Sequence, residues 1–272
     1  MKTRILQVII VTALFVSASF SLSAQPMPDS THLKIKAVVR SISRNCHTDY
    51  EKAKAIYEWF LDNMGYDYEL KKRIENDITS AYGEYKNPPK RVRDEAERYV
   101  KQLNKDFLTL GGIAFEKRMG ICSNLAHLYM LMCEEAGVKC KVVIGIVIGE
   151  DGFSGHAWNI VEIYGEKRLV DVTNGIISEH NEIDELSKAF LQLLGLTGFD
   201  MIPQNMIFGG YLPSYPEDQC LDKPYTNRQF ANEIIELYGE DISVSEKIAF
   251  RRTFCKNVNY FNKMYRDVSF NW

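Results

Sequence analysis

The chain has 272 residues, of which 46% are hydrophobic and 25% are charged, and its formal net charge at pH 7 is −3. These are the proportions of a globular protein and exclude a chain that is disordered throughout. The acidic balance, without a basic stripe interleaved with aromatic residues, excludes nucleic acid as a partner. At roughly 150 residues per domain, we expect one large domain, or one domain with an extension.

The first 24 residues have the pattern of a secretory signal peptide. Lys2 and Arg4 precede an apolar stretch over residues 5–20, and small residues lead up to Ala24. A membrane anchor is the alternative, but two serines interrupt the stretch, which leaves it short of the ~20 apolar residues that span a bilayer. We therefore expect cleavage near Ala24, a secreted or periplasmic location, and no membrane span in the mature chain.

The first helix is predicted directly after a capping box. Thr48 and Glu51 have the three-residue spacing of that motif, and apolar residues at helical spacing continue to Met64, where Gly65 follows. The next stretch, about residues 70–110, is charged and rich in tyrosine.

Within this stretch, residues 90–108 have the pattern of a solvated helix. We expect Gly111 and Gly112 to end that helix, because paired glycines interrupt helical structure.

The segment that begins at Cys122 predicts an amphipathic helix. Its apolar residues fall 3, 4, 7, 10, 11 and 14 positions after Cys122, which is one face of a helix: Leu125, Ala126, Tyr129, Met132, Cys133 and Ala136. Gly137 follows as the C-cap. Cys122 therefore lies at the helix N-terminus, on the face that packs inward.

Three stretches rich in valine and isoleucine predict strands, at residues 138–148, 156–164 and 167–172. A turn at Gly165 joins the last two as an antiparallel hairpin. Further helices are predicted over residues 183–194 and after the Thr226/Gln229 and Ser243/Glu246 capping pairs. Helices before and after antiparallel strands indicate an α+β protein.

The six cysteines are irregularly spaced, with no Cys-x-x-Cys pair and no accompanying histidine cluster. A structural zinc site is therefore poorly supported, and no HExxH motif indicates a metal-dependent hydrolase. If Cys122 is reserved for chemistry, five cysteines remain and at least one of them is unpaired. We expect free thiols, no metal and no cofactor.

Cys122 has the setting of a reactive thiol. Unsatisfied N–H groups and the helix dipole favour the thiolate at a helix N-terminus, and a thiolate nucleophile needs a proton-carrying partner, normally histidine. His156 is the best of the five histidines because it opens a strand after a glycine-rich turn, where it can meet a helix end. The other four lie near the N-terminus, further along the same helix or in a polar loop: His32, His47, His127 and His180. A purely packing role for Cys122 is the alternative, since cysteine is often buried.

A histidine base needs a third group that fixes its tautomer. With the hairpin turn at Gly165, the residue opposite His156 is about Asn174. Asp171 lies a few residues away from that position and needs a bulge or a different register to reach His156. Both Asp171 and Asn174 are therefore candidates.

Three blocks of the sequence together resemble the transglutaminase-like superfamily. They are residues 118–122 with the helix that follows, residues 155–159 and residues 169–173, in this order and at family-like spacing. The resemblance covers roughly residues 50–232 and is closest to the transglutaminase/protease-like domains named for cytokinesis. It implies a papain-like fold, in which a central helix carrying the cysteine packs on an antiparallel sheet.

On this resemblance, Cys122 is the nucleophile, His156 is the base and general acid, and Asp171 orients His156. The backbone N–H of Cys122 is the expected oxyanion donor. The chain departs from the family after the cysteine, at residues 123–125, and after the aspartate, at residues 172–174. These positions flank the cleft and bear on substrate preference.

The expected domain organisation has four parts. A signal peptide over residues 1–24 is followed by a leader over 25–47, a transglutaminase-like domain over 48–232 and a C-terminal helical extension over 233–272. The insertion at about residues 70–110 belongs to the third part.

Two functions follow from the sequence. The first is an exported cysteine-dependent acyl-transfer enzyme that attacks a peptide or protein amide, such as a cell-wall peptide, through a thioester. Water as the acceptor makes it a peptidase or amidase, and an amine makes it a transglutaminase. The second is a non-catalytic binding or scaffold module with the same fold.

Overall fold

The computed structural model describes residues 28–73, 107–149, 152–180, 196–205, 209–238 and 243–265. The expected signal peptide, most of the expected insertion and the helix expected over residues 183–194 lie outside these ranges. Among the described residues, no helix is both long and apolar enough to cross a membrane.

The described chain is an α+β protein, as predicted. Its helices are α2 (Asp29–Ile42), α3 (Asp49–Asn63), α6 (Phe107–Lys117), α7 (Cys122–Glu135), α8 (Val172–His180), α10 (Asn227–Tyr238) and α11 (Val244–Tyr265). Its strands are β1 (Gly65–Tyr66), β2 (Met119–Gly120), β3 (Cys140–Gly149), β4 (Gly152–Ile163), β5 (Glu166–Val170) and β6 (Tyr211–Pro213). β1 and β2 form a short parallel pair, and the other strands form one antiparallel sheet in the order β5-β4-β3-β6.

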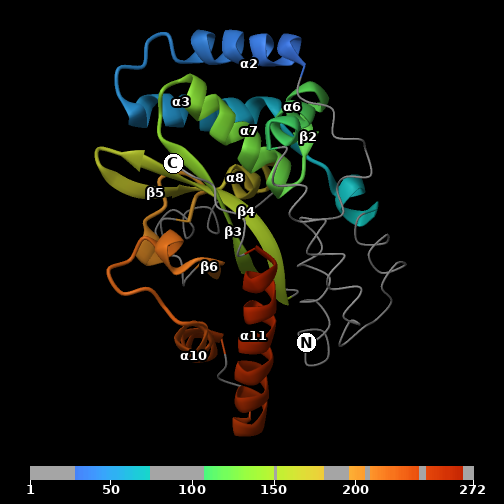
Figure 1. Ribbon diagram of the computed structural model, residues 1–272, viewed down its shortest axis with the longest axis vertical. Coiled ribbons are helices and arrows are strands. Elements are labelled where there is room, and N and C mark those ends of the chain that lie inside the picture. The colour runs from blue at the N-terminus through green and yellow to red at the C-terminus, as the bar shows by residue number, and fades with distance from the viewer. Residues whose placement is uncertain are drawn as a thin grey trace.

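The sheet is buried on both faces, because its side chains alternate between two apolar clusters. On β4, Ala157 and Val161 join the large cluster that includes α3 and α7, whereas Trp158 and Ile160 join a smaller cluster on the opposite face. β3 and β4 curve through the centre of the molecule (Figure 1). This sheet positions two residues of the site described below, one on β4 and one directly after β5.

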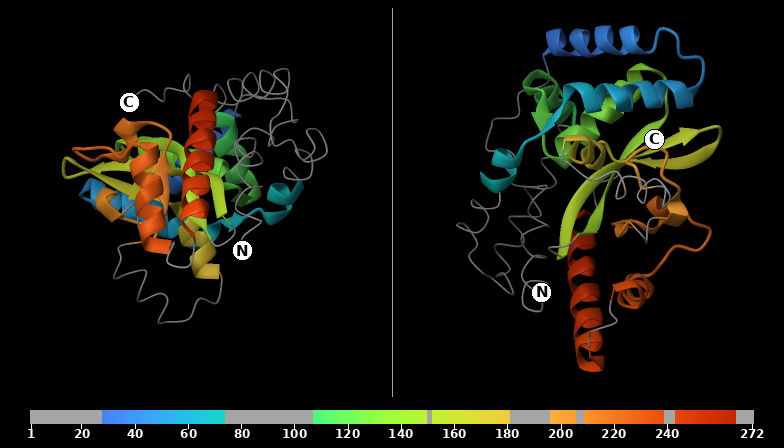
Figure 2. Two further views of the ribbon diagram at one scale, coloured as in Figure 1. Left: turned by 90° about the horizontal axis from the view of Figure 1, so that it is seen from below. Right: turned by 180° about the vertical axis from the view of Figure 1, so that it is seen from behind.

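The helices cover the sheet in layers. α7 lies against the sheet, α3 lies beyond it, and α2 is outermost, at the end of the molecule opposite α11 (Figures 1 and 2). α2 lies within the segment expected as a leader, and its Ile35 and Val39 are buried in the large cluster. From the other end of the chain, Phe254 and Val258 of α11 join the same cluster.

The prediction that Gly111 and Gly112 end a helix is wrong, because both lie inside α6. The reason is a close approach of two helices. A Cβ atom at Gly111 would lie 2.6 Å from Cδ1 of Leu131 and 3.1 Å from the backbone of Leu128, both on α7. Glycine is used here for packing, and the loss of helix propensity is offset by that contact.

Local signals at the helix ends are confirmed. Thr48 and Glu51 form the reciprocal capping box at the start of α3. The Thr226/Gln229 and Ser243/Glu246 pairs make the same reciprocal bonds before α10 and α11. α7 begins at Cys122, as its spacing predicts.

The β4–β5 hairpin turns at Tyr164 and Gly165, which both have positive φ, at 54° and 79°. This pair of angles is the type I′ turn, whose twist matches that of the flanking strands. The register that follows pairs Ile163 with Glu166 and, at the far end, Asn159 with Val170.

Candidate active site

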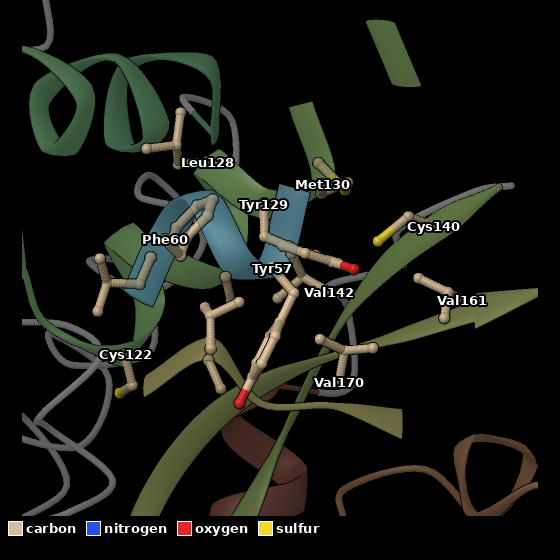
Figure 3. Close-up of a cluster of buried hydrophobic side chains, with 14 of the residues drawn as sticks. Tyr57, Phe60, Cys122, Leu128, Tyr129, Met130, Cys140, Val142, Val161 and Val170 are labelled. Carbon is tan, nitrogen blue, oxygen red and sulfur yellow. The ribbon is translucent and has the colours of Figure 1, made fainter. Parts of the chain in front are cut away.

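Cys122 lies at the junction between a loop and α7. Ile121 has an extended backbone, and its N–H donates to Oδ1 of Asn124 over 3.3 Å, which closes the first turn of the helix. Asn124 is one of the positions at which the chain departs from the family, and its side chain here caps the N-terminus of α7. Cys122 is at one side of the large cluster, with Cys140 at the other (Figure 3). Only 8% of its surface is exposed.

The Cys122 thiol has two partners from β4. The side chain of His156 and the backbone N–H of Ala157 lie close enough to the Cys122 sulfur to favour its thiolate. The β4–β5 pairing ends at Asn159, so Ala157 lies where β4 has no β5 neighbour. This open edge leaves the N–H free to reach the helix terminus.

His156 links Cys122 to Asp171. Its Nε2 lies 2.7 Å from Oδ2 of Asp171. Because Nε2 is used in this contact, Nδ1 is the ring nitrogen that remains for the thiol. The structure therefore brings the three predicted residues together, with Cys122 beside His156 and a hydrogen bond between His156 and Asp171.

The register of the hairpin explains how Asp171 reaches His156. Extended beyond Asn159–Val170, it places Asp171 diagonally across from His156 on the same face, without the expected bulge. The prediction that Asn174 lies opposite His156 is off by one residue. Asn174 instead donates its backbone N–H to Oδ1 of Asp171 over 3.0 Å, so it supports the aspartate.

Asp171 is fully buried, and each of its polar groups has a partner. Oδ2 accepts from His156 and also from the Tyr211 hydroxyl, at 2.7 Å each. Its backbone N–H donates to the Gly198 carbonyl over 2.6 Å. A buried carboxylate is tolerated only when it is paired and hydrogen-bonded, and this one is.

The charges of Cys122, His156 and Asp171 shift one another's pKa values. Burial opposes ionisation of Asp171, but the charge and hydrogen bond of His156 outweigh it and lower the Asp171 pKa. Burial likewise opposes charge on His156, whose pKa is raised to about 10 by Asp171 and by Cys122. The bond and charge of His156, with the Ala157 N–H, lower the Cys122 pKa in spite of burial. Both shifts favour the ionised pair, a thiolate beside an imidazolium, over the neutral pair.

The other residues singled out in the sequence are structural. His127 is buried on α7, its Nδ1 lies 2.6 Å from the Ser123 carbonyl, and burial lowers its pKa to about 4. Cys133 is fully buried in the large cluster, at the core position its spacing indicates. Trp158 is also buried, and its ring is stacked 6.0 Å from that of His156.

Two elements of the site were not identified from the sequence. Tyr211 lies in a stretch interrupted by glycine and proline, and no periodicity marked it. Gly198 has a φ of +88°, and its carbonyl accepts from Asp171. Neither has a local signal, because both reach Asp171 only through the tertiary fold.

Within the ranges that the structure describes, no three side chains of histidine, cysteine, aspartate or glutamate are placed to hold a metal ion. All six cysteines are free thiols.

Comparison with known proteins defines the class. A helix that presents a cysteine to a histidine and an aspartate on an antiparallel sheet is the arrangement of papain-like and transglutaminase-like folds. The model of the transglutaminase-like superfamily matches residues 36–171, half of the chain and all three site residues. The protein belongs to the transglutaminase-like superfamily.

The curated relatives are much longer proteins. Kyphoscoliosis peptidase of Homo sapiens is 27% identical over 203 residues, covering 72% of this chain and 25% of the relative. Its counterpart in Mus musculus is 26% identical over 206 residues, covering 73% of this chain and 26% of the relative. The chain thus spans about a quarter of the length of these proteins.

Two solved structures align with part of this chain. A candidate cysteine protease from Cytophaga hutchinsonii is 14% identical, with a TM-score of 0.38, over 70% of this chain and 44% of that one. A structure described as a TGase is 16% identical, with a TM-score of 0.37, over 63% and 37% of the two chains. The family assignment depends on the superfamily model and not on these overlaps.

Proposed function

We propose that this protein is a cysteine-dependent acyl-transfer enzyme that acts on peptide or protein amides through a thioester. The observation that carries the proposal is the arrangement of Cys122 beside His156, whose ring is hydrogen-bonded to the buried Asp171. A buried thiol with only a packing role does not require a histidine held by a buried carboxylate. The curated relatives, named as peptidases, support the same class of chemistry.

In the first half of the reaction, the Cys122 sulfur attacks the amide carbonyl carbon, and the carbonyl oxygen becomes an oxyanion. The first N–H groups of α7 have no intrahelical acceptor, so they can donate to that oxygen. The His156 imidazolium then gives its proton to the leaving amine as the C–N bond breaks. The products of this half are a free amine, a thioester on Cys122 and a neutral His156.

In the second half, neutral His156 removes a proton from the acceptor as it attacks the thioester. With water, the products are a carboxylic acid, the Cys122 thiolate and the protonated His156, which together restore the starting pair. With an amine, the product is a new amide. Asp171 holds the His156 ring in one tautomer throughout, because its Oδ2 accepts from Nε2.

The first experiment is the pH dependence of Cys122 alkylation by iodoacetamide, read by peptide mass spectrometry. We expect a midpoint well below the ~8.5 of an ordinary thiol, and we expect His156→Ala to raise it. An ordinary midpoint that is indifferent to His156 would overturn the proposal. Cys133→Ala is the matched control, since that thiol lies on the same helix without contact to His156.

Turnover is tested with a fluorogenic peptide-amide library, with and without an added primary amine. Release of the reporter by water alone indicates a peptidase or amidase, and amine incorporation indicates a transglutaminase. Cys122→Ala should abolish either activity in a protein that still folds, as shown by a cooperative thermal unfolding transition. Activity that persists in that variant would contradict the role of Cys122.

A non-catalytic binding module is the second candidate, and one observation favours it. Cys122 is only 8% exposed, so little of the residue is open to a substrate. Alkylation distinguishes the two functions. A thiol that iodoacetamide does not reach in the folded protein would favour the binding module.

We also propose that the protein is exported and is cleaved after Ala24. The basic start, the apolar stretch and the small residues of the first 24 positions support this. N-terminal sequencing of the protein expressed from its full sequence should find Gln25 as the first residue. An intact N-terminus on protein retained inside the cell would contradict export.

A further inference from the structure

Tyr211 lies 40 residues beyond the end of the superfamily match, yet it makes a direct bond to the site. It is the first residue of β6, which pairs with β3 at the edge of the sheet, with Val147 opposite Tyr211. Its ring belongs to the small cluster on the sheet face opposite α7. The hydroxyl therefore approaches Asp171 from the side of the sheet that the cysteine does not occupy.

The Tyr211 hydroxyl donates to Oδ2 of Asp171 over 2.7 Å. The same oxygen accepts from Nε2 of His156, also at 2.7 Å. The carboxylate oxygen that faces the histidine thus has two donors at once, and its orientation is fixed by both of them. A phenol that only filled space would not need to place its hydroxyl on this oxygen.

The Tyr211 ring also supports His156 through an intermediate aromatic residue. It meets Trp158 edge to face, with ring centroids 5.2 Å apart and an interplanar angle of 80°, and Trp158 is stacked on His156. Such aromatic contacts favour defined geometries. Tyr211 therefore limits the movement of both members of the His156–Asp171 pair.

The backbone around Tyr211 is held on both sides. The Ile148 N–H donates to the Gly210 carbonyl over 3.0 Å. The Ser214 N–H donates to the Ile144 carbonyl over 2.9 Å. Gly210 has a φ of +70°, a conformation that suits glycine. These bonds hold β6 against β3 on both sides of Tyr211, and so fix the position from which its hydroxyl reaches Asp171.

The hydroxyl is also restricted to the role of donor. Burial, together with the charge and bond of Asp171, raises the Tyr211 pKa well above its usual value. The phenol is therefore protonated at neutral pH, where it acts on Asp171 as a hydrogen-bond donor.

We infer that Tyr211 is a positioning residue for acyl transfer, which holds the Asp171 carboxylate against His156 and shields part of its charge from the Cys122 thiolate. This inference rests on the proposed function. Asp171 is one of the groups that oppose ionisation of Cys122, and His156 is the group that promotes it. Loss of the Tyr211 bond should therefore disfavour the thiolate in two ways, through a looser His156 and a less shielded Asp171.

The test is Tyr211→Phe, which removes the hydroxyl and keeps the ring against Trp158. Tyr129→Phe is the matched control, because its buried hydroxyl donates to the Ala53 carbonyl over 3.0 Å, away from Asp171. Alkylation of Cys122 by iodoacetamide is followed against pH in both variants. We expect Tyr211→Phe alone to raise the midpoint and to slow labelling about tenfold at pH 6, since a bond to a charged group is being removed.

A second readout separates this inference from the proposed function. The ring of His156, labelled with ¹³C, is titrated by NMR in the Cys122→Ala background with and without Tyr211→Phe. A titration that shifts only when the Tyr211 hydroxyl is removed supports the inference, whatever the reactivity of the thiol. Equal alkylation midpoints and equal titrations in wild type, Tyr211→Phe and Tyr129→Phe would overturn it.

Discussion

Asn159 on β4 pairs with Val170 on β5, and this register places Asp171 on the His156 side of the sheet. Side chains alternate along a strand, so a slip of one residue would turn Asp171 to the opposite face. The slip is prevented at the other end of the hairpin, where Tyr164 and Gly165 form a tight two-residue turn. A turn at the surface of the molecule thus determines which residue reaches the histidine.

The first prediction separates Asp171 from Asn174. We expect Asp171→Asn to slow iodoacetamide labelling of Cys122 about tenfold or more at pH 6, because the imidazolium loses its buried counter-charge. Asn174→Ala keeps the backbone N–H that donates to Asp171, so it should change the labelling rate less than twofold. A larger effect from Asn174→Ala would show that its side chain, and not Asp171, orients the histidine.

The second prediction concerns stability against pH. The His156 pKa is raised to about 10, so its contribution to the free energy of unfolding is complete below its unfolded value of ~6.5 and is lost as the pH rises toward 10. The Cys122 pKa is lowered, so its contribution grows with pH up to its unfolded value of ~8.5. In the wild-type protein these two slopes have opposite signs, so each offsets part of the other.

Removing the thiol should therefore expose the slope that belongs to His156. In Cys122→Ala, we expect the free energy of unfolding, from urea denaturation, to fall above pH 6.5 by up to ~1.4 kcal/mol per pH unit. Adding His156→Gln should flatten the curve again. A flat curve for Cys122→Ala alone would mean that Asp171 does not hold the proton on His156.

The third prediction concerns Gly145, which pairs with His156 across β3 and β4. A Cβ atom there would lie 2.3 Å from the Leu212 carbonyl oxygen and 2.5 Å from the ring of Trp158. Gly145→Ala must therefore separate β6 from the sheet or move the ring that stacks on His156. We expect a loss of ~2 kcal/mol or more in stability, together with slower labelling of Cys122.

Gly65→Ala is the control for this prediction, since a Cβ atom at Gly65 meets its neighbours only at 3.8 Å or beyond. Urea denaturation should place it within ~1 kcal/mol of the wild type. If Gly145→Ala were as stable as Gly65→Ala, the close approach of β6 to β3 would be in doubt.

The fourth prediction concerns the buried ion pair of Lys141 on β3 with Asp218, in the 3-10 helix Pro216–Gln219 that follows β6. Both side chains are 11% exposed. Lys141→Met leaves a buried carboxylate without its partner, and we expect it to cost ~3 kcal/mol or more. Combining it with Asp218→Leu should recover much of that loss. Additive losses in denaturation experiments would show that the two charges do not interact.

The sequence by itself determined the local elements and the residues of the candidate site. Capping pairs such as Thr48 with Glu51, the apolar face that follows Cys122 and the turn at Gly165 are short-range signals that hold in the structure. The resemblance at the cysteine, histidine and aspartate blocks agrees with the superfamily match. Each of these depends on residues that are neighbours along the chain, so the sequence is enough to recognise them.

The tertiary structure decided what depends on contacts between distant segments. Gly111 is a helix residue because Leu131 on α7 leaves no room for a Cβ atom there. Asp171, rather than Asn174, meets His156 because one register was selected from several that the sequence allows. Tyr211 joins the site because β6 returns to the edge of β3. These outcomes are set by packing and strand pairing across the whole fold, and no local pattern encodes them.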